Sequence, residues 1–344
     1  MTALLFVLLL VVLVVIHEFG HFIVAKWWGV RVDEFSVGFG PRLFGWKRRG
    51  TEYSFRLLLL GGYVRLYGME PGQEETPDSF NSRPMIGRVL TIAAGPVMNF
   101  LLAIALFWVL FSAIGVPQYV PGPPGIGGLE QGMPAQRAGL RTGDRLIAAN
   151  GHALRSWNGL LHVVSSADGH PILFTVQRGS RRFDVSLTPK PDPLTHNVRH
   201  IGVLPLVQNV QAPLLTGFVK GVQQTWNGAG MLISVIAGSL AHGKAPPVSG
   251  IVGIYGAVQQ AESAGIAQVL TLAAVLSVNL GLINLVPFPP LDGERLVMLA
   301  IEWIRGRRLD PQREAMVNSI GLMILLGLAV VLAYHDIVRM HGTL

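Results

Sequence analysis

The sequence contains no cysteine and few charged residues. Of its 344 residues, 14% are Asp, Glu, Lys or Arg, against about 25% in soluble domains. Without cysteine the chain can form no disulfide, and a metal site must use His and carboxylate ligands. The low charge and a hydrophobic content of 50% exclude a chain that is soluble throughout, although its length leaves room for a soluble domain.

Long apolar segments account for much of the chain. About 20 apolar residues cross the hydrocarbon core of a membrane, and four segments meet this requirement: 3–25, 89–116, 264–286 and 317–334. A weaker stretch at 231–240 is short and flanked by glycine, so we expect it to be interfacial or packed against the other helices. The first segment lacks the basic start and the A-x-A site of a signal peptide, which predicts a helix that is retained.

Lys and Arg are concentrated in two of the connecting loops. Ten lie within residues 26–88 and five within 295–313, whereas the segment before the first span has none. The positive-inside rule places these two loops in the cytoplasm, and both termini and residues 117–244 outside. The formal charge of +7 therefore indicates membrane topology, and we expect no nucleic-acid partner.

The outside segment has the pattern of a small β/α domain. Apolar runs at 145–149, 172–177 and 183–187 alternate with turn signals such as Asn150-Gly151 and Asp168-Gly169. We predict a domain over 117–192, followed by a linker and an amphipathic or interfacial segment over 193–263. These lie between an N-terminal membrane core, 1–116, and a C-terminal membrane core, 264–344.

A His-Glu-Phe-Gly-His motif lies inside the first apolar segment. On a helix, positions i and i+4 share one face, so His17 and His21 can reach one metal ion with Glu18 beside it as a base. The alternative to a metal site is a pair of histidines buried in the core and a glutamate held in a salt bridge. Burying three such groups in a spanning helix is expensive without a metal, so the motif predicts a zinc site in the membrane.

A catalytic zinc site takes three protein ligands and leaves one position for water. The best candidate for the third ligand is Asp292, because Pro287, Pro289 and Pro290 break the helix before it and free the backbone to turn the carboxylate inward. Glu294 is the rival, but it neighbours Arg295 and is expected to face solvent.

The loop at 26–88 is unusually apolar between residues 53 and 66. This stretch predicts two strands, with Gly61-Gly62 at a turn or bulge. Strand backbone is tolerated at membrane depth only where protein or a water-filled cavity covers it. We therefore expect a hairpin that dips toward the metal site.

Taken together, these motifs resemble the site-2 protease family, and within it the RseP-type intramembrane zinc metalloproteases. The resemblance covers nearly the whole chain and is carried by motifs in a fixed order: His17-Glu-Phe-Gly-His21, Gly38-Phe-Gly40, Gly61-Gly-Tyr-Val64, Gly95-Pro-x-x-Asn-Phe100 and Asn284-x-x-Pro-x-Pro-x-Leu-Asp-Gly293. It implies cleavage of membrane-spanning segments of single-span substrates in regulated intramembrane proteolysis, with anti-sigma factors or signal-peptide remnants as typical substrates.

The resemblance also implies residue roles. His17, His21 and Asp292 would bind Zn²⁺, Glu18 would be the general base, and Asn284 would contact the substrate backbone. The alternative for Asn284 is a hydrogen bond between packed helices. Two glycine pairs would line a membrane-reentrant sheet that receives the substrate as an added strand: Gly38, Gly40, Gly61 and Gly62. Gly95 and Asn99 would serve close helix packing.

Residues 134–151 resemble the core of a bacterial PDZ domain. PDZ domains bind peptides by strand addition; here Gly125–Gly128 is only a weak candidate for the carboxylate-binding loop, so a steric filter against bulky substrates is an equal alternative. Many relatives carry two such domains, whereas one fits here.

The sequence thus predicts a polytopic α-helical protein with about four transmembrane helices, a membrane-reentrant β-hairpin region and one extracytoplasmic PDZ domain. It would reside in a bacterial inner membrane, with the active site near the cytoplasmic side. The alternative function is an inactive PDZ-bearing scaffold or chaperone, which would be expected to have lost a ligand or the base. A transporter would leave the His-Glu-Phe-Gly-His motif unexplained.

Overall fold

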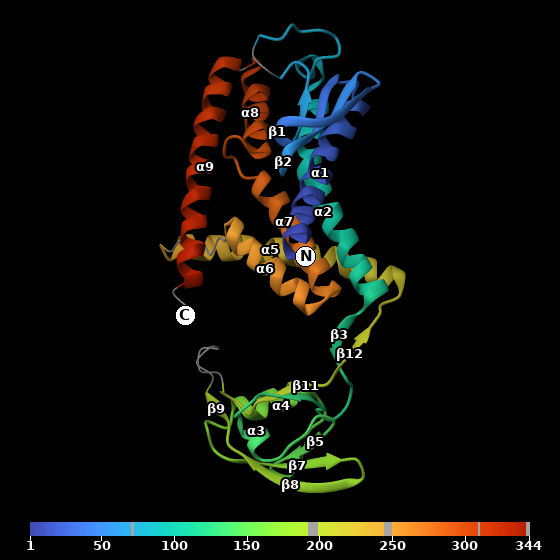
Figure 1. The fold of residues 1–344 in the computed structure, drawn as a ribbon, viewed down its shortest axis with the longest axis vertical. Coiled ribbons are helices and arrows are strands. Elements are labelled where there is room, and N and C mark those ends of the chain that lie inside the picture. Colours follow the sequence, from blue (N-terminus) through green and yellow to red (C-terminus); the bar gives the residue numbers. More distant parts are fainter. Residues whose placement is uncertain (70–71, 192–198, 244–249, 309, 342–344) are drawn as a thin grey trace. The chain divides into compact units, whose positions relative to one another are not determined.

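The computed structural model describes residues 1–69, 72–191, 199–243, 250–308 and 310–341 (Figure 1). Contacts within the chain define two compact units. One unit combines residues 1–113 with 212–344, and the other comprises residues 114–211. The first contains the long helices and the predicted metal ligands, and the second contains most of the short strands.

Four helices of the first unit are long and apolar enough to cross a membrane, which confirms the predicted spans. They are Thr2–Trp27 (α1), Met85–Ile114 (α2, Met85–Val109, with its π-helical end Leu110–Ile114), Ile266–Asn284 (α7) and Glu314–Val338 within α9 (Pro311–His341). Only 6–33% of the most apolar window of each helix is buried inside the structure. The apolar surface that remains is what a lipid-facing surface requires.

Small residues let these helices approach one another closely. A Cβ at Gly20 of α1 would lie 2.3 Å from the carbonyl oxygen of Ala94 in α2, so α1 and α2 are in contact there. Farther along α2, the Ser277 hydroxyl of α7 donates a 2.7 Å hydrogen bond to the carbonyl oxygen of Asn99. Helix α2 therefore joins the helix that carries the histidines to the helix that precedes Asp292.

Two further helices, α5 (Leu214–Ala241) and α6 (Ile251–Ala264), run crosswise to α1 in Figure 1. Helix α5 packs on α2 through Gly217 and Gly221, where an added Cβ would meet Ser112 and the carbonyl oxygen of Ile104. The predicted weak stretch at 231–240 is the second half of α5. Within the described residues α5 is not one of the candidate spans, in agreement with the prediction.

The two strands predicted within 53–66 form one long strand, β2 (Thr51–Leu66), which pairs with β1 (Val32–Arg48). The hairpin turn therefore lies at Arg49-Gly50, whereas Gly61-Gly62 lies within β2. Each long strand bends once, so residues near Phe35 pair with β2 on both sides, with Tyr53 on one and Val64 on the other. The result is four adjacent segments, in which the two outer pairs run antiparallel and the two middle segments, 51–55 and 34–37, run parallel. Their order across the sheet is 44–48, 51–55, 34–37 and 62–66.

A buried carboxylate fastens this sheet and the bend in β1. Glu34 is only 5% exposed and accepts hydrogen bonds from the Ser54 hydroxyl (2.7 Å) and the Arg56 guanidinium (2.6 Å). Arg56 also donates to the carbonyl oxygen of Gly40 (2.8 Å). Gly38 and Gly40 have φ of +94° and +80°, values that favour glycine, so the Gly-Phe-Gly turn depends on both its glycines and this anchor.

Helix α7 ends at Asn284 and helix α8 (Asp292–Arg305) begins at Asp292. The intervening segment contains the three prolines, which cannot continue a helix. An added Cβ at Gly293 would lie 2.3 Å from the carbonyl oxygen of Val286, so the returning chain packs tightly against its own start. The predicted helix break before Asp292 is thus present.

The second unit is the predicted small β/α domain. Its elements are β3 (Val116–Tyr119), β4 (Ile126–Leu129), α3 (Pro134–Arg137), β5 (Arg145–Ala149), β6 (His152–Ala153), α4 (Trp157–Ser165), β7 (Ile172–Arg178), β8 (Arg181–Leu187), β9 (Lys190–Pro191), β10 (Arg199–His200), β11 (Val203–Pro205) and β12 (Val207–Val210). Strands β6, β5, β7 and β8 form an antiparallel sheet in that order. Asn150 and Gly151 close the β5–β6 hairpin with φ of +47° and +80°, as predicted.

This unit runs past residue 192, the predicted end of the domain. Strand β11 returns to pair with β4, and β12 pairs with β3, so residues up to 211 belong to the same compact unit. Residue 192 itself lies outside the described residues. The segment predicted as linker and amphipathic region, 193–263, therefore contributes strands to one unit and helices α5 and α6 to the other.

Candidate metal centre

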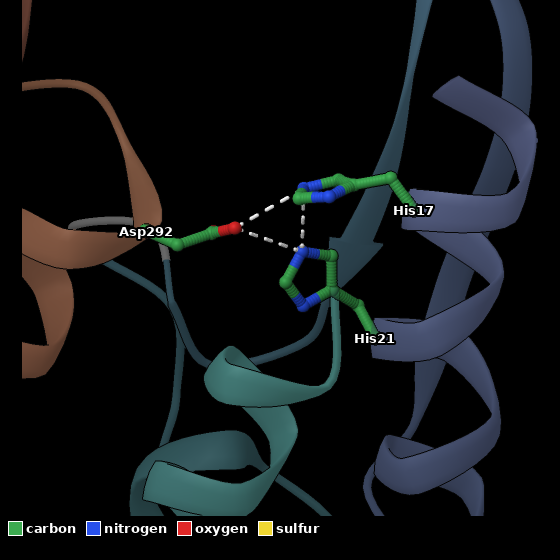
Figure 2. A group of neighbouring side chains, drawn as sticks. All are labelled: His17, His21 and Asp292. Carbon is green, nitrogen blue, oxygen red and sulfur yellow. Dashed lines mark hydrogen bonds and ion pairs between the residues drawn. The ribbon is translucent and has the colours of Figure 1, made fainter. Parts of the chain in front are cut away.

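Helix α1 brings the two histidines of the predicted motif together. His17 and His21 lie on one face of α1 and are 7% and 8% exposed. Their Nε2 atoms are 3.2 Å apart, as the i, i+4 spacing predicts. Both rings point away from the helix toward the same place (Figure 2).

Asp292, the first residue of α8, reaches the same place. Its Oδ2 atom lies 3.1 Å from Nε2 of His17 and 3.4 Å from Nε2 of His21 (Figure 2). This oxygen is buried and accepts no hydrogen bond from the described part of the protein. A buried carboxylate oxygen without a partner is unfavourable unless a cation lies beside it.

The three atoms have the spacing of zinc ligands. Ligands about 2.0–2.1 Å from a tetrahedral zinc ion lie about 3.3 Å from one another. The observed separations are 3.1, 3.2 and 3.4 Å, so one ion could contact all three atoms and keep a fourth position for water. The residues present therefore fit a zinc ion of the catalytic type.

Contacts from α2 orient both imidazoles. Nδ1 of His21 lies 2.9 Å from the carbonyl oxygen of Thr91, which can only accept. Nδ1 of His21 therefore carries the proton, and the lone pair of Nε2 points to the centre. Nδ1 of His17 lies 3.0 Å from the side-chain amide nitrogen of Asn99, and the amide oxygen of Asn99 has no partner among the described residues. A half-turn of that amide lets its oxygen accept the Nδ1 proton of His17, which frees Nε2 for a metal.

Gly95 leaves the space that the imidazoles occupy. A Cβ at this position would lie 2.2 Å from Nε2 of His21 and 2.8 Å from Cε1 of His17. Sequence reasoning assigned Gly95 and Asn99 to helix packing and did not consider Thr91. Their spacing of four residues could have indicated a shared role, because Thr91, Gly95 and Asn99 fall on one face of α2.

Glu18 lies between the two histidines in sequence and faces the sheet. A Cβ at Gly62 would lie 3.7 Å from Cγ of Glu18, and the backbone N–H of Val64 lies near the Glu18 carboxylate. The edge segment 62–66 thus runs directly beside the predicted base.

Among the described residues the cluster of possible metal ligands consists of His17, His21 and Asp292, without Glu294. The expectation that Glu294 faces solvent is wrong: it is 4% exposed, and neither of its carboxylate oxygens has a hydrogen-bond partner in the described structure. Burial raises the pKa of this carboxyl above its ordinary value. The side chain is turned inward because the preceding Gly293 packs against the end of α7.

The other predicted binding residues are distributed over the surroundings of the cluster. Gly38 and Gly40 form the bend in β1, Gly61 lies against the ring of Phe39, and Gly62 approaches Glu18. Asn284 is the last residue of α7 and is half-buried. Within the described part of the chain its amide makes no hydrogen bond, so the interhelical bond that was the alternative for this residue is not formed.

A model of Peptidase family M50 matches residues 5–328 of the chain. Zinc metalloprotease RasP of Geobacillus kaustophilus is 30% identical over 413 residues, which cover 96% of each protein. Regulator of sigma-W protease RasP of Bacillus subtilis is 29% identical over 423 residues, covering 98% of this chain and 99% of that protein. Among solved structures, the PDZ domain of the SdrC-like protein (Lmo2051) from Listeria monocytogenes is similar at 15% identity and a TM-score of 0.23, and covers 26% of this chain and 93% of its own.

Proposed function

The chain belongs to Peptidase family M50, the site-2 protease family, and we propose that this membrane-bound zinc metallopeptidase cleaves peptide bonds inside the membrane-spanning segments of single-span proteins. The observation that carries the proposal is the depth of the ligands. His21 and His17 precede the end of α1 at Trp27 by six and ten residues, or about 9 and 15 Å along the helix. In a hydrocarbon core about 30 Å thick, that depth suits a substrate that is itself in the membrane.

We propose His17, His21 and Asp292 as the ligands of zinc and Glu18 as the general base. When bound, zinc would polarise the scissile carbonyl and lower the pKa of a water molecule toward about 7. Glu18 would accept the proton of that water as it attacks and then deliver it to the departing amine nitrogen. Thr91 and Asn99 would hold the imidazoles in the tautomers that present Nε2.

The segment 62–66 is proposed to receive the substrate. A substrate helix hides its carbonyls in internal hydrogen bonds, so it must unwind before hydrolysis. Pairing with an edge strand restores those bonds, and this edge lies beside Glu18. Asn284, whose amide has no partner within the described residues, would hydrogen-bond the substrate backbone near the scissile bond.

Orientation and substrate class belong to the same proposal. The distribution of Lys and Arg supports a cytoplasmic position for the Trp27 end of α1 and an extracytoplasmic position for residues 114–211. That unit would act as a PDZ domain that binds substrate tails, or as a filter that excludes substrates with bulky outside domains. Because one relative is named a regulator of sigma-W protease, an anti-sigma factor is the substrate we would test first.

The test compares Glu18→Gln with the unchanged protein on a single-span model substrate in proteoliposomes. Loss of the base should lower the cleavage rate by a factor of about 10² to 10⁴ and leave the zinc content unchanged. Glu74→Gln, which removes an exposed carboxylate elsewhere, is the matched control and should cleave normally. Wild-type cleavage by zinc-loaded Glu18→Gln protein would disprove the role of Glu18 as the base, whereas absence of cleavage by the unchanged zinc-loaded protein would favour the inactive scaffold.

Metal analysis of Asp292→Ala protein completes this test. We expect its zinc content to fall, because one of three ligands is lost, whereas Glu294→Ala protein should retain the metal. Undiminished zinc in Asp292→Ala protein would remove Asp292 from the ligand set.

A further inference from the structure

The β1–β2 sheet is strongly apolar at the end where both strands bend. Five large side chains there are 37–66% exposed: Phe39, Leu43, Leu57, Leu58 and Leu59. Arg42 and Arg56 are paired residues near this end. Their guanidinium groups form ion pairs with Glu52 and Glu34, toward the opposite end of the sheet. Such an arrangement keeps the charge away from an apolar environment while the aliphatic stem stays in it.

The opposite end of the sheet is basic. Lys47, Arg48 and Arg49 are consecutive and exposed, and none of the three forms an ion pair within the described part of the chain. Between the two ends, Trp46 stacks on Tyr53 with ring centroids 5.4 Å apart and an interplanar angle of 14°. The order apolar, aromatic, basic is the order met on going from the hydrocarbon core of a membrane through its interface to its headgroups.

The structure relates both ends of the sheet to α1. Near the basic end, the Thr51 hydroxyl donates to the carbonyl oxygen of Val32 (2.8 Å), and Val30 donates to the carbonyl oxygen of Ala25 in the last turn of α1 (2.8 Å). Farther from this end, Gly62 lies against Val14 and Glu18. The basic end is therefore level with the end of α1, at a membrane surface.

The backbone at Arg49 gives a second observation. Arg49 and Gly50 connect the paired residues Arg48 and Thr51, with φ of +48° and +80°. A two-residue turn of this kind strongly favours Asn-Gly, because its first position also requires positive φ. A positively charged residue thus occupies a position that the backbone alone would give to Asn, and no described protein group accounts for it.

We propose that the turn Lys47–Arg48–Arg49 binds the anionic headgroups of phospholipids at the surface where α1 ends. This contact would hold the sheet at the depth at which segment 62–66 faces Glu18, because Thr51 beside the turn hydrogen-bonds to Val32, and Val32 pairs with Leu66. The proposal depends on the membrane span of α1 and not on the proposed proteolysis.

The test uses the absence of cysteine from the chain. Full-length Leu43→Cys protein, labelled with an environment-sensitive dye, is reconstituted in vesicles of phosphatidylcholine with or without phosphatidylglycerol. Dye depth is measured with lipids that carry a quencher at known depths. We expect the anionic lipid to increase the deeply inserted population, by about fivefold for each of the three charges, and salt to weaken this response.

In the same background, the triple substitution K47Q/R48Q/R49N should abolish the response to phosphatidylglycerol. A matched triple, R155Q/R181Q/R182Q, removes three exposed basic residues from the β/α unit and should keep it. Arg49→Asn alone is the most informative variant, since it improves the turn but removes one charge. It should reduce the response about fivefold, whereas a response equal to that of the parent protein would show that Arg49 contributes nothing to lipid binding.

Three other results would overturn the proposal. They are equal dye depth in neutral and anionic vesicles, an unchanged response in the K47Q/R48Q/R49N protein, and a shift caused by inorganic phosphate in neutral vesicles. None of these measurements requires cleavage of a substrate. They can therefore disprove the proposed lipid binding without bearing on the proposed proteolysis.

Discussion

Gly95 shows how a residue without a side chain can shape the proposed metal site. The imidazoles of His17 and His21 lie where its Cβ would be, so α2 can pass the cluster only with glycine at this position. The same helix supplies the carbonyl of Thr91 and the amide of Asn99 that orient the rings. Residues of α2 therefore determine the positions of the two imidazoles as much as the motif on α1 does.

Gly95→Ala should therefore separate helix stability from metal binding. Alanine favours a helix over glycine by about 1 kcal/mol, but its methyl would collide with Nε2 of His21. We expect loss of zinc without loss of helix content, measured by metal analysis and circular dichroism. Gly228→Ala in α5, where an added Cβ meets nothing within 4 Å, is the control. Full zinc occupancy in Gly95→Ala protein would contradict the geometry.

Asn99 should affect the metal through the tautomer of His17. Asn99→Asp retains an oxygen that can accept the Nδ1 proton, whereas Asn99→Ala retains none. Loss of such a contact lowers metal affinity by about 10 to 100-fold, so titration with a zinc buffer should show that loss for alanine and little loss for aspartate. Equal affinities for the two variants would indicate that Asn99 serves only helix packing.

At the scale of elements, the position of the sheet edge is the main structural result. Sequence patterns predicted two strands within 53–66, but β1 passes between the two halves of β2. This insertion leaves 62–66 at the edge and places it against α1. Local patterns cannot specify that order, because strand pairing depends on contacts between segments that are far apart in sequence.

Val64→Pro tests this edge. The N–H of Val64 lies near Glu18, so we expect it to point away from the paired segment 34–37, an orientation in which edge strands tolerate proline. We expect about a tenfold or greater loss of cleavage, corresponding to one hydrogen bond to a charged group, with zinc content unchanged. Tyr63→Pro, displaced by one residue, should instead disrupt the sheet and increase its hydrogen exchange. Normal cleavage by Val64→Pro protein would contradict a role for this N–H beside Glu18.

The hydropathy pattern predicted only the second half of helix α5. The apolar stretch at 231–240 predicted a short interfacial segment, whereas the helix runs from Leu214 to Ala241. Its first half contains Gly217 and Gly221, which weaken helix propensity. Those glycines allow contact with α2, so packing extends the helix beyond its own apolar pattern.

At the scale of the whole molecule, the chain consists of two units that differ in what stabilises them. The β/α unit has a closed hydrophobic core that includes Phe174, Leu146 and Ile126. It also contains a buried carboxylate, Asp144, which is 1% exposed and accepts two 2.7 Å hydrogen bonds from Arg178. Those bonds hold the pKa of Asp144 below its ordinary value.

The stability of this unit should therefore depend on acid pH. Because the pKa of Asp144 is lowered in the folded state, its contribution is complete above about pH 4 and is lost as the pH falls through the folded-state pKa. Asp144→Asn should lose about 2 kcal/mol at neutral pH and lack that part of the acid dependence. Hydrogen exchange of β5, β7 and β8 in the intact protein measures both effects, with the helices of the other unit as internal reference. Equal protection in the two proteins at neutral pH would refute this role.

The sequence by itself determined the four spans, the spacing of His17 and His21, and the β/α domain with its hairpin turns. These features follow from local periodicity and from the preferences of Asn, Gly and Pro, which act over a few residues. Asp292 was also within reach, because the prolines before it mark a break in an apolar helix.

Only the tertiary structure decided which groups surround those residues. The contacts of Thr91, Gly95 and Asn99 with the imidazoles, the inward position of Glu294 and the order of the four sheet segments each depend on distant parts of the chain. Hydrogen bonds and close packing depend on the positions of individual atoms in neighbouring elements. A sequence pattern predicts which residues share one face of a helix, but it does not predict which element packs against that face.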